Sequence, residues 1–147
     1  MASPHVEVLK ALLKQNGASL TKPRRLLFEL LLNQKPQTIK ELVELAGQKV
    51  DRASIYRTLE LFEKLGIVQR LNIGWKHKFE LSDAFIGHHH HLHCTSCNQS
   101  FSLEASPMLE TMIDSVAAKA AFYPRSHQLE IYGLCAKCKK RAKELGS

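Results

Sequence analysis

Four cysteines arranged in two Cys-x-x-Cys pairs constrain this chain more than any other feature of its sequence. Cys94 and Cys97 form one pair, Cys135 and Cys138 form the other, and there is no further cysteine. A Cys-x-x-Cys turn directs two sulfur atoms, about 3.5–4 Å apart, toward one point, and two such turns supply the four thiolates of a closed tetrahedral zinc site. We therefore predict a structural Zn²⁺ site made by these four residues.

The separation of the two pairs sets a condition on the fold. The segment between Cys97 and Cys135 is longer than in a short zinc ribbon, so it must form structure that returns the second pair to the first. Two reactive dithiols, or four unrelated core cysteines, are the alternatives. Disulfides are not expected, because nothing in the sequence resembles a signal peptide.

The positive charge of the chain lies in its first half. The net charge is +7, and residues 1–82 contribute +6 of it, from 14 Lys and Arg side chains against 8 Asp and Glu side chains. Such a field suggests a polyanionic partner, although a basic balance is often only a soluble surface. No apolar run approaches the ~20 residues of a membrane span, so we expect one soluble domain or two small ones and no membrane partner.

Helical periodicity predicts four helices in the first half. The apolar positions that carry the pattern are Val6, Leu9, Leu12 and Leu13, then Leu26, Leu27, Leu30 and Leu31, then Leu42 and Leu45, and finally Ile55, Leu59 and Phe62. Thr38 and Glu41 have the spacing of a capping box, and Asp51 can cap the fourth helix. Gly47 and Gly66 stand where the third and fourth helices should end.

After Gly66 the pattern changes to a period of two. Trp75, His77, Phe79 and Leu81 alternate with Lys76, Lys78 and Glu80, and Asn72-Ile73-Gly74 offers a turn after a strand over 67–71. Helices followed by a basic hairpin predict a winged helix, in which the helix over 51–65 would enter the major groove and the hairpin would contact phosphates. A winged helix that binds protein, with its basic face solvated, is the alternative.

The second half has a different pattern. We predict strands over 88–94, 101–103 and 127–134, and a helix that starts at Ser106-Pro107. Its inward face is made by Leu109, Met112, Ile113, Val116, Ala117 and Ala120. A half this small buries little apolar surface alone, so we expect a homodimer, with an intrachain core as the other use of the helix face. The predicted fold is α+β, a winged helix followed by a small α/β dimerisation domain that carries the four-cysteine zinc site.

The sequence resembles the ferric uptake regulator family over nearly its whole length. The motifs that carry the resemblance are 21-TKPR-24, 54-SIYRTL-59, 78-KFEL-81, the run 88-HHHHLHCTSC-97 and 127-HQLEIYGLC-135. The resemblance implies a DNA-binding domain over 1–82, a hinge over 83–87 and a dimerisation domain over 88–147. It also implies a metal-activated transcriptional repressor in the bacterial cytoplasm, with double-stranded operator DNA as its partner. Residues expected at the DNA are Lys14, Arg24, Arg52, Ser54, Tyr56, Arg57 and Lys76.

Strand geometry separates the histidines into two groups. Successive side chains of a strand point to opposite faces, so His89 and His91 share one face, and His88 and His90 share the other. The resemblance places Glu80, His89 and His91 in a regulatory site at the hinge. It places His88, His90, Glu110 and His127 in a site inside the dimerisation domain. We interpret His5, His77 and His93 as hydrogen-bonded surface groups.

The chain also departs from the family pattern at two expected ligands. Pro36 stands where a histidine would tie the DNA-binding domain to the hinge metal. Ser102 stands where a carboxylate is expected, and Glu104 is close enough to replace it. These departures put the hinge site in doubt.

Several functions remain open from the sequence. The expected one is a repressor of metal-ion uptake and homeostasis genes, with structural Zn²⁺ and with Fe²⁺, Zn²⁺ or Mn²⁺ as the regulatory ion. Iron is favoured because every cysteine belongs to a pair, whereas zinc sensors of this family typically place a cysteine in the regulatory site. A zinc-responsive or peroxide-responsive regulator of the same family, or a histidine-rich metal buffer or chaperone, is the alternative. An enzyme with a small organic substrate is not expected, since no substrate pocket is evident.

Overall fold

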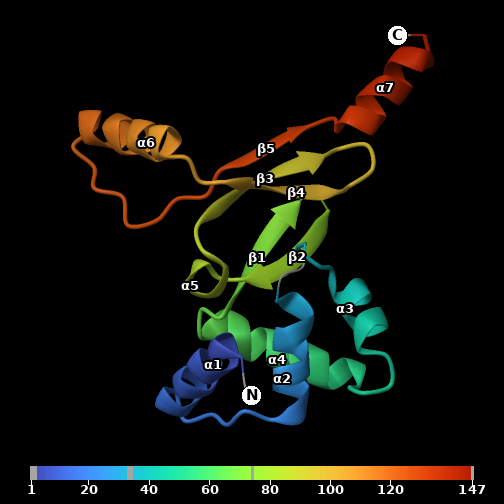
Figure 1. Cartoon of the computed structure of the whole chain (residues 1–147), viewed down its shortest axis with the longest axis vertical. Helices are drawn as coiled ribbons and strands as arrows, with labels where there is room; N and C mark the ends of the chain where they lie inside the picture. The colour runs from blue at the N-terminus through green and yellow to red at the C-terminus, as the bar shows by residue number, and fades with distance from the viewer. Residues whose placement is uncertain (1–2, 33–34, 74, 147) are drawn as a thin grey trace. The chain divides into compact units, whose positions relative to one another are not determined.

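The computed structural model describes residues 3–32, 35–73 and 75–146, and the chain divides into two compact units between Gly87 and His88 (Figure 1). The first unit contains α1 (Pro4–Gln15), α2 (Lys22–Leu31), α3 (Ile39–Ala46), α4 (Arg52–Lys64), β1 (Val68–Ile73), β2 (Lys76–Leu81) and α5 (Asp83–Ile86). The second contains β3 (His89–Cys94), β4 (Ser100–Glu104), α6 (Pro107–Lys119), β5 (Glu130–Gly133) and α7 (Ala136–Glu144). This confirms the predicted α+β fold class. In the described ranges, no helix is long and apolar enough to cross a membrane.

Side-chain caps fix where the helices of the first unit begin. At α3, Thr38 Oγ1 accepts a hydrogen bond from the Glu41 N–H at 3.2 Å, and Glu41 Oε2 accepts one from the Thr38 N–H at 2.7 Å. At α4, Asp51 Oδ1 accepts from the Ser54 N–H at 2.6 Å. Both caps satisfy amide donors that a helix start leaves without an intrahelical acceptor, and both confirm the sequence prediction.

The core of the first unit lies among its helices and hairpin. Its largest fully buried side chains include Phe28, Phe62 and Leu9, and every apolar position predicted for α4 is buried. At α3 the prediction for Leu45 was wrong. Leu45 is 53% exposed and Ala46 is buried instead, because Ala46 lies one turn after Leu42 on the same face.

The stretch expected as a hinge contains a short helix. Phe85 of α5 contacts the ring of Phe28 edge-on, with ring centroids 5.1 Å apart, and belongs to the core of the first unit. Gly87 follows α5 with φ of +77°, a backbone conformation that suits glycine.

The predicted wing is present as an antiparallel hairpin of β1 and β2, with register from Val68↔Leu81 to Ile73↔Lys76. The predicted turn was placed too early, because Asn72 and Ile73 belong to β1, and Gly74 lies outside the described residues.

The predicted alternation of β2 was also wrong. Trp75 precedes the strand and is fully exposed, whereas Lys78 and Glu80, expected on the polar face, are buried. The edge of the hairpin has a backbone neighbour in the first unit, because Gln37 pairs with Phe79 through two hydrogen bonds of 2.9 and 2.7 Å.

The second unit is built on a three-stranded sheet in the order β4-β3-β5. β3 runs antiparallel to β4 and parallel to β5. β5 is shorter than the strand predicted over 127–134, and α7 was not predicted at all. The histidine-rich strand is therefore central, with a neighbour on each side.

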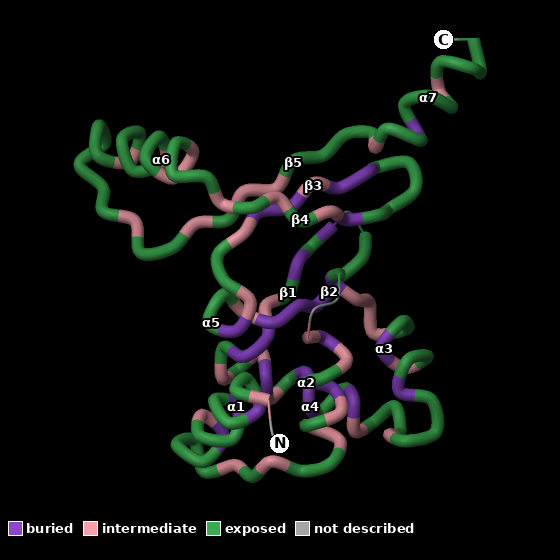
Figure 2. The backbone as a smooth tube through the Cα atoms, in the orientation of Figure 1, coloured by how far each residue is buried: buried purple, intermediate pink, exposed green. Residues whose placement is uncertain are grey.

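Helix α6 contributes no buried residue (Figure 2). It was expected to face inward, but Met112 and Val116 are 59% and 63% exposed. An intrachain core is therefore the wrong interpretation of its apolar face.

Candidate metal centres and nucleic-acid interface

The four cysteine sulfurs come together at one end of the second unit. Cys94 ends β3, Cys97 lies in the turn toward β4, Cys135 precedes α7, and Cys138 lies in its first turn. All four Sγ atoms lie within 4.8 Å of one another, and Cys97 Sγ lies 3.9 Å from Cys135 Sγ. Four sulfurs at this spacing fit a tetrahedral Zn²⁺ ion after a small contraction.

Backbone amides prepare one of these sulfurs for its role as a thiolate. The Cys135 N–H donates to Cys94 Sγ at 3.3 Å. This hydrogen bond, with a second one from the backbone of Cys97, lowers the pKa of Cys94 to about 6. The thiolate is the form that binds metal, so the turn favours the ligand before the ion arrives.

Three histidines and a carboxylate form a second cluster, on the opposite face of β3 from His89 and His91. His90 Nε2 lies 2.7 Å from Glu110 Oε1, and His127 Nε2 lies 2.9 Å from Glu110 Oε2. His88 Nε2 lies 3.0 Å from His127 Nε2 and 3.5 Å from Glu110 Oε2. The structure thus brings together all four residues expected inside the dimerisation domain.

The carboxylate of this cluster is held ionised. The hydrogen bond with His90, together with the nearby charges of His127 and His88, lowers the pKa of Glu110. Three imidazoles and one ionised carboxylate make an N/O donor set that suits Zn²⁺, Fe²⁺ or Mn²⁺.

The residues expected at the hinge are divided between the two units. Glu80 lies on β2, where its Oε1 accepts a hydrogen bond from Gln69 Nε2. His89 and His91 lie on β3 with ring centroids 4.7 Å apart. Glu104 lies opposite His89 in the β3–β4 register and is exposed. Pro36 is buried and offers no ligand atom.

A third group in the second unit was missed from the sequence. His91, His93 and Glu130 each place one ligand atom within 4.8 Å of the others. His93 was interpreted as a surface group, but it is 2% exposed. His5 and His77 are exposed, as expected. Alternation along the strand places His93 on the same face as His91, so the sequence held a signal for this pair. It held none for Glu130, because only the parallel register of β5 with β3 brings Glu130 to them.

The predicted DNA-contacting residues of α4 lie on its outer face. Tyr56 is 45% exposed, and the guanidinium of Arg52 lies over its ring at 5.8 Å. Arg57 Nη2 lies 3.4 Å from Ser54 Oγ. The cap at Asp51 holds the start of this face, and the Ser54 N–H that it accepts lowers the pKa of Asp51.

A polar hollow joins this face to the start of α2. Arg24, Ser54 and Arg57 all line it, and its volume is about 180 Å³. Arg24 Nη1 donates to the Ser19 carbonyl, which holds the guanidinium at the hollow. Lys14 and Lys76 are exposed on other elements, α1 and β2.

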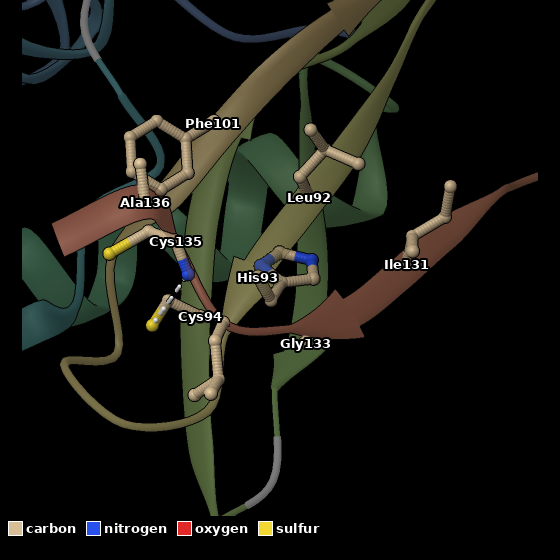
Figure 3. Close-up of a pocket in the computed structure, with 9 residues that line it drawn as sticks. Leu92, His93, Cys94, Phe101, Ile131, Gly133, Cys135 and Ala136 are labelled. Atoms are coloured by element: carbon tan, nitrogen blue, oxygen red, sulfur yellow. Dashed lines mark hydrogen bonds between the residues drawn. The ribbon is translucent and has the colours of Figure 1, made fainter. Parts of the chain in front are cut away.

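An apolar hollow of about 390 Å³ lies on the sheet of the second unit (Figure 3). Phe101, Leu92 and Ile131 form a row across its three strands, because Leu92 pairs with the other two in the register. Ile131 is 46% exposed. This face, like α6, leaves apolar surface open in a single chain.

Comparisons with known proteins agree with this architecture. Residues 15–132 match the model of the ferric uptake regulator family. A ferric uptake regulation protein of Legionella pneumophila is 33% identical over 133 residues, which cover 86% of this chain and 95% of the relative. The crystal structure of the Vibrio cholerae ferric uptake regulator is similar, with a TM-score of 0.73, 30% identity, and coverage of 86% of this chain and 99% of the other. A structure of the Francisella tularensis regulator with iron matches with a TM-score of 0.69 and 26% identity over 84% of this chain and 96% of the other.

Proposed function

Since this chain belongs to the ferric uptake regulator family, we propose that it is a homodimeric repressor in the cytoplasm whose binding to operator DNA is switched on by a divalent metal ion. The family is one of metal-responsive regulators of transcription, and we propose no enzymatic activity for this chain. The finer parts of the proposal are the DNA-contacting residues, the dimer interface, the roles of the metal sites and the identity of the ion.

The DNA interface that we propose is the outer face of α4 with the start of α2. Tyr56 and Arg57 would meet base edges in the major groove, and Arg24 a phosphate. Arg52, Ser54, Lys14 and Lys76 would add contacts at the edges of this interface. The excess of positive charge in residues 1–82 supports this assignment.

The dimer interface that we propose uses the uncovered apolar surface of the second unit. Helix α6 has no buried residue, and the row across the sheet is partly open. Exposed apolar surface of this kind on a chain of 147 residues supports an association site. A second copy would cover α6 and would pair two DNA-binding units, as a palindromic operator requires.

We propose that Zn²⁺ at the four cysteines has a structural role. Cys94 and Cys97 would hold one side of the ion, and Cys135 and Cys138 the other, which would tie α7 to the end of β3. Because the ligands are assembled only in the folded chain, binding energy at this site contributes to folding.

The regulatory ligands would act by restricting the motion of the two units relative to each other. Glu80 comes from the first unit, while His89, His91 and Glu104 come from the second, so drawing them together would link the units. In a dimer, the two DNA-binding units would then be held at one distance from each other. That distance would match the spacing of the two half-sites of an operator. A coupling of ~1–3 kcal/mol would change DNA affinity about 5–150-fold.

We propose that part of the activation by metal comes from the second group of ligands, His88, His90, Glu110 and His127. Pro36 removes one expected hinge ligand, whereas these four residues form a complete set at short distances. Every cysteine belongs to the zinc group, so the regulatory donors are nitrogen and oxygen only. Fe²⁺ is the ion that we propose, although Zn²⁺ would bind more tightly in vitro by the Irving–Williams order.

The observation that carries the proposal is the joint presence of a capped basic helix and assembled metal-ligand groups in one chain. Anaerobic selection from a random duplex library, with Fe²⁺ present, should recover near-palindromic sites, and a chelator should release the protein from them. Parallel titrations with Mn²⁺ and Zn²⁺ would rank the activating ions. Recovery of no sequence above background, with metal bound, would indicate a metal buffer and contradict the proposal.

A further inference from the structure

His91, His93 and Glu130 make a site that neither proposed regulatory site uses in full. His91 and His93 alternate along β3 and therefore share a face, and Glu130 of β5 pairs with His91 in the parallel register. Their ligand atoms lie within 4.8 Å of one another, and the two imidazole rings are stacked with centroids 5.8 Å apart. Three chemically suitable donors from two adjacent strands thus point into one small volume.

The distances suit a transition-metal ion. Two ligands each about 2.1 Å from a tetrahedral ion lie about 3.4 Å apart. His93 Nε2 and Glu130 Oε2 are 3.7 Å apart, so a contraction of a few tenths of an ångström would bring this pair to the required spacing. That distance is too long for a direct hydrogen bond between them.

Neighbouring side chains already orient two of the donors. His93 Nδ1 lies 2.9 Å from Ser100 Oγ, which turns Nε2 toward Glu130. Tyr132 Oη donates to Glu130 Oε2 at 2.8 Å and steadies the carboxylate. Metal-ligating histidines and carboxylates commonly have such outer partners, because these partners fix the ring and its tautomer.

We propose that His91, His93 and Glu130 form a further metal site that binds a divalent ion of the zinc and ferrous class. Two neutral imidazoles and one carboxylate favour these ions over Ca²⁺ or Mg²⁺, which prefer oxygen ligands. Three protein ligands leave a tetrahedral ion one position for water. The site shares His91 with the proposed hinge site, but its other two ligands belong to neither regulatory site, so it goes beyond the proposed function and its test does not depend on DNA binding.

The test is the Co²⁺ stoichiometry of the full chain after Zn²⁺ has been loaded at the four cysteines. Glu130→Gln should lose one Co²⁺ per chain, because the amide removes the charge but keeps an oxygen that can accept from Tyr132. Glu144→Gln, in exposed α7, is the matched control and should lose none. His93→Gln should lose the same ion, whereas His77→Gln on the wing should not.

The readouts separate this site from its alternatives. Circular dichroism and retained zinc report folding, and the visible Co²⁺ spectrum reports the loss of nitrogen ligands. Unchanged stoichiometry in folded Glu130→Gln would overturn the site and leave His93 and Glu130 as a simple ion pair. Loss of the ion would support the site even if selection recovered no operator.

Discussion

Two neighbouring arginines of α2 give the sharpest test of the proposed DNA interface. Arg24 lines the polar hollow with Arg57 of α4, whereas Arg25 does not line it and is paired with Glu29 at 2.9 Å. If Arg24 contacts a phosphate, Arg24→Ala removes one such contact from each protomer and two from each dimer. Arg25→Ala removes the same charge from the same helix without a predicted contact, so it is the matched control.

The expected magnitude follows from counterion release. Each phosphate contact contributes about 0.9 to the log-salt slope, so two lost contacts should reduce the slope by ~1.8. The parent should therefore bind DNA more tightly than Arg24→Ala by a factor that depends on salt. This factor should be about twelve-fold larger at about 50 mM salt than at about 200 mM salt.

Fluorescence anisotropy of a labelled operator duplex, at saturating metal and four salt concentrations, would measure both slopes. Arg25→Ala should keep the parent slope. An unchanged slope for Arg24→Ala, or an equal change for the two variants, would refute the assignment.

Three further predictions concern the reader helix and the metal sites. Tyr56→Ala should weaken the binding free energy by ~1–3 kcal/mol on operator DNA and by much less on random DNA. Competition binding measures both duplexes, and an equal loss of affinity on the two would show that Tyr56 reads no base. Cys135→Ser should release zinc and weaken the dimer while the first unit stays folded. Analytical sedimentation measures the dimer, and a fully stable dimer without bound zinc would contradict a structural role for this site. His90→Ala should reduce metal-activated DNA binding at least as much as His89→Ala. Gel retardation across a metal titration decides this point, and loss of activation only in His89→Ala would show that the hinge suffices despite its missing ligand.

Local signals in the sequence predicted the parts of the fold that depend on neighbouring residues. The Thr38–Glu41 capping box, the Asp51 cap and the buried stripe of α4 were all found where their spacing placed them. Such features depend on residues three or four apart, and that distance is visible in the sequence. The pairing of the cysteines was visible for the same reason.

Features that depend on strand pairing were predicted less well. Lys78 is buried although the alternation of the sequence placed it on the polar face of its strand. A period of two shows which residues share a face, but it does not show which other parts of the protein cover that face. Glu130 reaches His93 only through the parallel register of β5 with β3. Helix α7 follows Cys135 in a lysine-rich segment without an apolar stripe, so periodicity gave no signal for it.

The most direct test of the account is whether metal and operator DNA tighten each other's binding. The Kd of Mn²⁺, an ion that avoids the oxidation of iron, can be measured by competition with a chelator, with and without saturating operator duplex. Linkage requires that DNA strengthen metal binding by the same factor by which metal strengthens DNA binding, and we predict a factor of about 5–150 in both directions. A metal affinity that stays unchanged when the operator is bound would contradict a metal-activated repressor.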